Sequence, residues 1–420
     1  MVRCGTLINP HNRAVQEDVA IQTANGKIIR MAPSAELALP AGAQLLDFSD
    51  KFVIPGLVDL HAHTYTRVSG DWTTSNEAVP AFLLAAGVTT ARAPGSMNSS
   101  ADLALRNRIN EGLMTGPRYY FAGEYLDLAP STIPWFNASK TAEEIRMKID
   151  YWSAQGATAV KLYTRMSGDP LRAAVAHAHN HGLKVIGHLG DTSWKEAMEA
   201  GIDELCHSVF AVPESGIKFR FANGRVAFDG LDQLDLKDPK FAEILRLAAS
   251  LKVVLVPTAM NNRTIVSLPA YRRYYTDAAW KAIEEMASKK VPGLPEKFAP
   301  VEKEWIRMAH ASGSLLATGT DLVIPWMPPG VSLWQEAEFF ADCGLPPMDV
   351  LDAATWNGIF SIGATGQLGT LEPGKLADFV VLDANPLDDI RNLERVHRVV
   401  KNGVVYDPRQ ILGRLQGRLN

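Results

Sequence analysis

The segment Val53–His63, which reads V-I-P-G-L-V-D-L-H-A-H, constrains the fold more than any other part of the chain. The run Phe52–Leu60 is short, apolar and β-branched at its start, and this pattern predicts one buried strand that a proline–glycine pair interrupts. Residues two apart in a strand point to the same side, so we expect His61 and His63 to project together. Two neighbouring imidazoles at a strand end are typical ligands of a borderline-soft metal such as zinc.

The composition is typical of a soluble globular enzyme. The chain has 420 residues, of which 47% are hydrophobic and 21% charged, a length that fits one large domain plus a smaller one. A net charge of -4 and a pI of about 6.2, without a basic patch, argue against nucleic-acid binding. The chain starts without an apolar leader and has no run long enough to span a bilayer. Three widely spaced cysteines predict reduced thiols. We therefore expect a cytoplasmic homo-oligomer with a small-molecule substrate and no membrane partner.

Both ends of the chain are predicted to be β-rich. Each carries a strong two-residue hairpin signal, Asn25-Gly26 near the start and Asn402-Gly403 near the end, between β-branched runs. Because each end is too small to bury a core alone, we expect the two to meet in one small β-sandwich domain. The predicted boundaries are 1–54 plus 367–420 for this domain and 55–366 for the remainder.

Between the two ends, strand-like and helix-like segments alternate. Repeated strand–helix units with eight strands predict an α/β fold, a (β/α)8 TIM barrel, in which chemistry gathers at the carboxyl ends of the strands. The predicted strands are Phe52–Leu60, Val88–Arg92, Arg118–Ala122, Ala159–Tyr163, Leu183–His188, Ile202–His207, Val253–Pro257 and Ser314–Gly319.

Residues of the types that bind or support metals occur at or near the ends of five of these strands. They are His61 and His63 on the first strand, Lys161 on the fourth, His188 on the fifth, His207 on the sixth and Asp321 after the eighth. Strand ends that meet at one barrel mouth would bring these side chains together, so we predict a metal centre there.

The motifs resemble those of the amidohydrolase superfamily along essentially the whole chain. They are P-G-L-V-D-L-H-A-H, V-K-L-Y-T, the two single histidines, G-T-D and the tail G-Q-L-G-T-L-E-P-G-K-L-A-D-F-V-V-L-D-A-N-P. Within the superfamily, the chain looks similar to the imidazolonepropionase-related hydrolases, which include binuclear prolidase-like peptidases and N-acyl-amino-acid hydrolases.

Lys161 determines the expected number of metals. It lies mid-strand, where burial on both faces favours the neutral amine, and a neutral amine can capture CO2 as a carbamate. The resemblance implies this carbamate and two divalent metal ions, with Zn2+ the default. It implies the following ligands: His61, His63 and Asp321 on one metal, His188 and His207 on the other, and Lys161 bridging both.

The reaction that the resemblance implies is hydrolysis of an amide C–N bond. A hydroxide that bridges the two cations would attack the carbonyl, and Asp321 would take its proton and pass it to the leaving nitrogen. One alternative is a mononuclear deaminase or cyclic-amide hydrolase, because the segment from His188 to Asp191 resembles the H-x-x-E of those enzymes. A second alternative is a metal-free scaffold of the same fold.

Candidate substrate contacts are Tyr163, which shares a strand face with Lys161, and Tyr125 and Trp135 of an aromatic loop after the third strand. Asp191 is either a substrate contact or a helix N-cap, although Ser193 already begins a capping box there. Prolidase-like relatives often carry a polar residue two positions after the fifth-strand histidine, where this chain has Gly190.

Two further segments have other expected roles. His177, His179 and His181 form an H-x-H-x-H pattern on a predicted helix, where residues two apart diverge, so we expect surface positions. The stretch 260–300 follows the seventh strand and contains a helix around Ala278–Ser288, which is a candidate lid over the barrel mouth.

Overall fold

The computed structural model describes most of the chain. The described residues are 1–64, 66–68, 71–73, 78–131, 136–222, 225–262, 268–288, 294–322 and 327–419. Trp135, one of the predicted substrate contacts, lies outside them, as do parts of the predicted lid.

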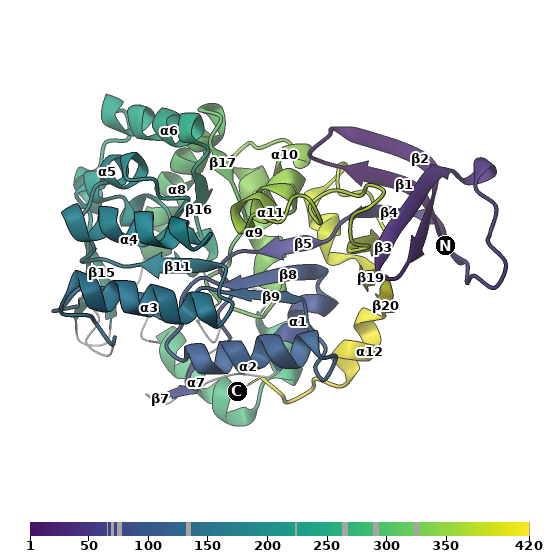
Figure 1. Ribbon diagram of the computed structural model, residues 1–420, viewed down its shortest axis with the longest axis horizontal. Coiled ribbons are helices and arrows are strands. Elements are labelled where there is room, and N and C mark those ends of the chain that lie inside the picture. The colour runs from purple at the N-terminus through teal and green to yellow at the C-terminus, as the bar shows by residue number, and fades with distance from the viewer. Residues whose placement is uncertain are drawn as a thin grey trace.

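Both ends of the chain contribute to one seven-stranded sheet, at one end of the molecule (Figure 1). In spatial order its strands are β20 (Val404–Tyr406), β19 (Val396–Lys401), β18 (Phe379–Leu382), β4 (Leu46–Pro55), β1 (Val2–Asn9), β2 (Ala14–Ala24) and β3 (Lys27–Pro33). The pairing is antiparallel except between β1 and β4. The predicted hairpin turns are confirmed, since Asn25 and Gly26 have φ of 51° and 77°, and Asn402 and Gly403 have 51° and 73°.

The central part of the chain forms two parallel sheets with a counterpart for each predicted strand. The three-stranded sheet contains β5 (Leu57–Asp59), β8 (Val88–Ala93) and β9 (Arg118–Phe121). The six-stranded sheet contains β10 (Tyr125–Leu126), β11 (Ala159–Leu162), β12 (Lys184–Gly187), β13 (Glu204–Cys206), β16 (Val254–Val256) and β17 (Leu315–Leu316). Two separate hairpins pair β6 (Thr66–Val68) with β7 (Asp71–Thr73), and β14 (Lys218–Ala222) with β15 (Arg225–Asp229).

Backbone hydrogen bonds link the two parallel sheets at both of their edges. On one side the Leu60 amide donates to the Thr318 carbonyl (3.1 Å), and on the other the Thr158 amide donates to the Phe121 carbonyl (3.2 Å). Together with the surrounding helices, these strands give a TIM-barrel-type fold with a β-rich domain.

Helices pack around the parallel strands (Figure 1). In the described part of the chain the α-helices are α1 (Ala78–Ala85), α2 (Ser99–Asn110), α3 (Ala142–Ala154), α4 (Gly168–Asn180), α5 (Trp194–Glu199), α6 (Pro239–Leu251), α7 (Asp277–Ser288), α8 (Leu294–Ala311), α9 (Val331–Asp342), α10 (Pro347–Ala353), α11 (Trp356–Ile362) and α12 (Pro408–Gly413). Within this part, none of the helices combines the length and the apolar character needed to cross a bilayer.

The interruption predicted at the proline–glycine pair within Phe52–Leu60 is confirmed, but the two sides of it belong to different sheets and do not form one strand. Pairing changes at Gly56, whose amide donates to Asp378 beside β18, whereas the next amide, that of Leu57, donates to Gly87 before β8. Gly56 also passes very close to β8, because a Cβ atom there would lie 1.9 Å from the hydroxyl oxygen of Thr89. The chain therefore leaves the seven-stranded sheet at Gly56 and enters the barrel as β5, and only a glycine fits at this junction.

Gly56→Ala is expected to lower the free energy of unfolding by about 1–3 kcal/mol, because the added methyl group overpacks a buried junction. Gly366→Ala is the matched control. Gly366 is exposed and no described atom lies within 4 Å of its added Cβ, so it should change stability by less than about 0.5 kcal/mol. Urea unfolding of both variants measures the difference, and equal midpoints would contradict the role given to Gly56.

Candidate metal centre

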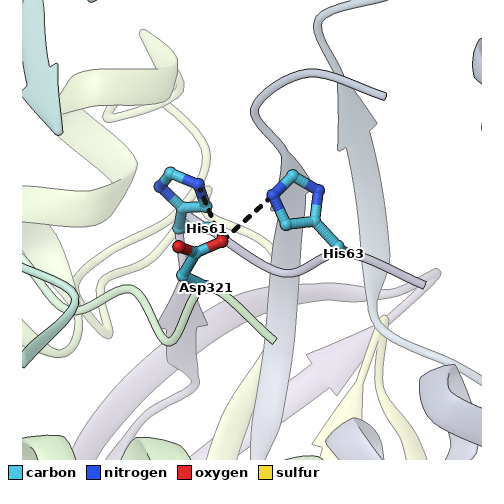
Figure 2. A group of neighbouring side chains, drawn as sticks. All are labelled: His61, His63 and Asp321. Carbon is cyan, nitrogen blue, oxygen red and sulfur yellow. Dashed lines mark ion pairs between the residues drawn. The ribbon is translucent and has the colours of Figure 1, made fainter. Parts of the chain in front are cut away.

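Three of the predicted ligands converge at the carboxyl ends of β5 and β17. Figure 2 shows the carboxylate of Asp321 between the imidazoles of His61 and His63. The Asp321 Oδ1 atom lies 3.4 Å from Nε2 of His61 and 3.2 Å from Nε2 of His63. One ligand atom from each side chain lies within 4.8 Å of the others, close enough to share one metal ion. Both histidines are about 3% exposed, so the group is enclosed by protein.

A fourth residue, Asp59, ties these ligands together. Its carboxylate is fully buried and accepts the backbone amides of His61 and Thr320, both at 3.1 Å, and the Thr320 hydroxyl at 2.8 Å. The Asp321 amide in turn donates to the carbonyl of His61 (2.7 Å). Sequence reasoning missed Asp59, although its spacing two residues before His61 puts it on the same strand face.

The other two predicted histidines lie beside this group. The rings of His188 and His207 are 4.3 Å apart, and the ring of His207 is 5.1 Å from that of His61. Nδ1 of His207 lies 2.8 Å from the hydroxyl of Thr258 and 3.8 Å from the Asp321 carboxylate. Thr258 was also missed, and the signal was available, because it directly follows the predicted seventh strand.

The backbone is left-handed at three of these strand ends. Asp321, His207 and Thr258 have φ of 53°, 73° and 49°, values that residues with a Cβ rarely adopt. Such conformations cost free energy and persist where the surrounding structure imposes them. Here they turn the three side chains toward one point, a geometry that strand periodicity alone does not predict.

Lys161 lies deeper in the barrel and is about 1% exposed. Its Nζ atom is 2.8 Å from the Sγ atom of Cys206, which is itself 3.7 Å from the Glu204 carboxylate. Glu204 forms a buried ion pair with Arg92 and accepts the hydroxyl of Ser361. The barrel interior therefore contains a polar network beneath the histidines. Cys206, predicted to be an ordinary core thiol, is part of it.

The electrostatics of the site suit a metal. Burial lowers the pKa of His61 and His188 far below the usual value, and that of His207 to about 3, so all three imidazoles are neutral. Burial would raise the pKa of Asp321, but the neighbouring histidines outweigh it and hold the carboxyl well below its ordinary range. Nδ1 of His61 has no hydrogen-bond partner among the described residues. Neutral imidazoles around an ionised carboxylate are a donor set that fits a divalent cation.

An aromatic cluster lies beside the ligands. Tyr125 stacks on Phe136 with ring centroids 4.4 Å apart, and Tyr163 contacts both rings at 5.3 and 4.9 Å. Tyr163 lies 4.5 Å from the ring of His188, and Tyr125 lies 6.4 Å from that of His63. Two of the predicted substrate contacts therefore lie next to the ligand group.

Tyr125 and Phe136 also line a cavity of about 270 Å3. Its other walls are mainly polar and come from the start of α2 and the strand end before β10, and include Ser96, Asn98 and Glu124. The cavity therefore shares two side chains with the aromatic cluster, whereas none of the predicted metal ligands lines it.

Asp191 lies apart from these contacts. It is exposed and forms an ion pair with Arg165 at 3.1 Å. The N-cap of α5 is Ser193, whose hydroxyl accepts the Glu196 amide (3.0 Å), so the predicted N-cap is confirmed, whereas the Glu196 carboxylate pairs with Arg172.

The match to a known protein family agrees with the motifs in the sequence. Residues 52–406 match the sequence profile of the Amidohydrolase family, which is most of the chain. The chain belongs to the amidohydrolase family. It is therefore a hydrolase that acts on carbon–nitrogen bonds, as the sequence predicted, and members of its family generally bind divalent metals.

The individual relatives described next are distant in sequence but cover nearly the whole chain. Imidazolonepropionase of Pseudomonas syringae pv. tomato is 22% identical over 410 residues, covering 93% of this chain and 94% of the relative. Among solved structures, a putative prolidase from Bifidobacterium longum is 24% identical with a TM-score of 0.72, covering 99% of this chain and 98% of that one. A Xaa-Pro dipeptidase with bound methionine is 21% identical with a TM-score of 0.71, covering 97% and 99%. At these identities, the structural similarity establishes the fold alone.

Thr258→Val is expected to weaken metal binding about 10–100-fold while the protein stays folded, because valine keeps the shape but cannot orient the His207 ring. Thr318→Val is the control. Thr318 is equally buried at the same barrel mouth, but its hydroxyl donates to the Val58 carbonyl (2.8 Å) and not to a histidine. Competition with a chelator measures the affinities, and equal losses in both variants would contradict the role given to Thr258.

Proposed function

We propose that this protein is a binuclear metal-dependent hydrolase of amide bonds in peptide-like or N-acyl-amino-acid substrates. The observation that carries the proposal is the convergence of the buried His61 and His63 with Asp321, 14% exposed, at two strand ends about 260 positions apart in the sequence. A neutral histidine pair, His188 and His207, lies directly beside them. A hydrolase of carbon–nitrogen bonds needs an activated water at such a place.

The proposed ligand sets follow the geometry. His61, His63 and Asp321 would hold one ion and His188 and His207 the other, and both ions would be Zn2+. Lys161 would bridge them as a CO2-derived carbamate, since its Nζ atom lies 2.8 Å from the Sγ atom of Cys206, the residue directly before His207. When bound, the ions would lower the pKa of a water molecule to near 7 and polarise the substrate carbonyl.

The side chains of the protein carry the remaining steps. Asp321, held ionised by its neighbours, would accept the proton of the attacking water and pass it to the leaving nitrogen. Asp59 and Thr258 would keep Asp321 and His207 in the orientation that this transfer requires.

Substrate recognition would use the aromatic cluster. Tyr163 and Tyr125 would contact the substrate beside the ligands, and Asp191 and Trp135, the latter outside the described residues, stay candidates from the sequence. Gly190 adds no side chain after His188, and a Cβ there would lie 3.1 Å from Thr164, so this position offers little room for the polar residue that prolidase-like relatives often carry. The peptide-like substrate class agrees with the prolidase and dipeptidase structures that the fold matches.

The remaining expectations form part of the proposal. The two parallel sheets would close into a (β/α)8 barrel over residues 55–366, and residues 1–54 plus 367–420 would form the β-sandwich domain. We also propose a cytoplasmic location and a homo-oligomer without nucleic-acid or membrane partners. The hydrolase relatives that span the chain support an enzyme and not a metal-free scaffold.

Activity assays test the function. The metal-loaded protein is expected to hydrolyse members of a panel of amides, dipeptides, N-acyl amino acids and cyclic ureas, and to lose this activity when a chelator removes the metal. Deamination or opening of a cyclic ureide by a protein with one bound metal would instead support the mononuclear alternative, with Asp191 as proton shuttle.

Asp321→Asn is expected to retain nearly normal metal content but to lose at least about 100-fold in turnover, because an amide oxygen can bind a metal but cannot carry a proton. Asp169→Asn is the matched control, since Asp169 is an exposed carboxylate that pairs with Arg172, and it should stay within about threefold of wild type. If Asp321→Asn retained full turnover with metals bound, the proton-transfer role of Asp321 would be wrong.

A further inference from the structure

A second group of metal-binding side chains lies on the outside of the barrel. It contains Asp150 of α3, His177 of α4 and His181, which caps the end of α4, and we call it the surface triad. Nε2 of His177 lies 2.6 Å from the Asp150 Oδ1 atom, and Nε2 of His181 lies 2.8 Å from the same oxygen. The two imidazole rings are 4.9 Å apart.

The spacing of the two histidines explains their convergence. Residues four apart share a helix face, so His177 and His181 project together, whereas His179 points elsewhere and pairs with Asp203 (2.9 Å). The surface positions expected for the three histidines are confirmed, but an i, i+4 pair lies within the H-x-H-x-H pattern. Asp150 from the neighbouring helix completes three donors within 4.8 Å of one another.

The triad is accessible and its charge favours a cation. The side chains of His177, His181 and Asp150 are 26%, 36% and 52% exposed, so an ion can enter from solvent and keep water in its remaining positions. A hydrogen bond from His177, together with the charges of both histidines, lowers the pKa of Asp150, so the carboxylate is ionised at neutral pH. Two imidazoles and one carboxylate oxygen are donors that suit Zn2+, Ni2+ or Cu2+.

The surface triad lies on the opposite face of the barrel from the predicted metal centre, so it takes no direct part in hydrolysis. Asp150 lies near the end of α3, which leads into the start of β11, and His181 lies just before the start of β12 (Figure 1). The triad is therefore at the amino ends of these strands, whereas His188 follows the carboxyl end of β12. In barrels of this type, that face contributes to stability and the opposite face to chemistry.

We propose that Asp150, His177 and His181 form a third metal site, which takes one borderline divalent cation and clamps α3 to α4. On binding, each Nε2 atom gives up the proton that it shares with Asp150 and donates its lone pair to the ion, and the protons pass to Nδ1 or to solvent. The bound ion would join the two helices that flank β11, the strand that carries Lys161. Binding of the ion therefore stabilises the folded barrel and does not change the rate of hydrolysis.

Zinc titration of the holoenzyme tests the site. With the buried centre already saturated, the wild-type protein should take up one further equivalent of Zn2+ by equilibrium dialysis, with a rise in thermal midpoint and unchanged turnover. His177→Gln and His181→Gln should both abolish this equivalent and the rise. Asp150→Asn should weaken it at least about tenfold.

His179→Gln is the matched control, because it removes a histidine from the same helix whose partner is Asp203. It should bind the extra zinc as the wild type does. The proposal is overturned if the His177 and His181 variants take up the same amount of zinc as the wild type. It is also overturned if His179→Gln loses as much zinc binding as these variants do, because either result would show that zinc binds nonspecifically to surface histidines.

Discussion

The buried carboxylate of Asp59 is the interaction on which the arrangement of the site depends. It accepts three hydrogen bonds from His61 and Thr320, and so it joins the end of β5 to the segment after β17, 261 positions away. Burying a carboxylate costs several kcal/mol unless hydrogen bonds compensate it, which makes the three contacts mutually dependent. Because Asp321 directly follows Thr320, the same junction sets the distance between the carboxylate and imidazole ligands.

Below this junction the barrel is unusually polar. The Arg92–Glu204 ion pair, Cys206 and Lys161 occupy space that branched apolar side chains fill in most TIM barrels. A polar interior of this kind keeps a lysine amine buried yet paired, close to the histidines above it. The left-handed backbone at His207, Thr258 and Asp321 completes the geometry, since it turns side chains inward at the points where strand periodicity ends.

Much of the fold could be predicted from the sequence, because hairpin turns and alternating strand–helix patterns are local signals. The Asn25-Gly26 and Asn402-Gly403 turns and a counterpart for each barrel strand are found where the sequence placed them. The interruption near Gly56 was predicted, but the transfer of the chain to a second sheet was not, because it depends on which other strands pair with each side. For the site, sequence reasoning identified the side chains that carry metal chemistry, but not Asp59, Thr258 or the contact of Cys206 with Lys161. Those contacts join residues 45 to 261 positions apart and arise only when the strands are assembled.

A crystal structure of the zinc-loaded protein, with anomalous diffraction recorded at the zinc edge, tests the central claim most directly. The account predicts two peaks about 3.5–4 Å apart, one against His61, His63 and Asp321 and one against His188 and His207. It also predicts density for a carboxylate on the Lys161 amine, between the two ions. A single zinc ion at full activity, with the Lys161 amine unmodified and still against Cys206, would contradict the binuclear centre and favour the mononuclear enzyme.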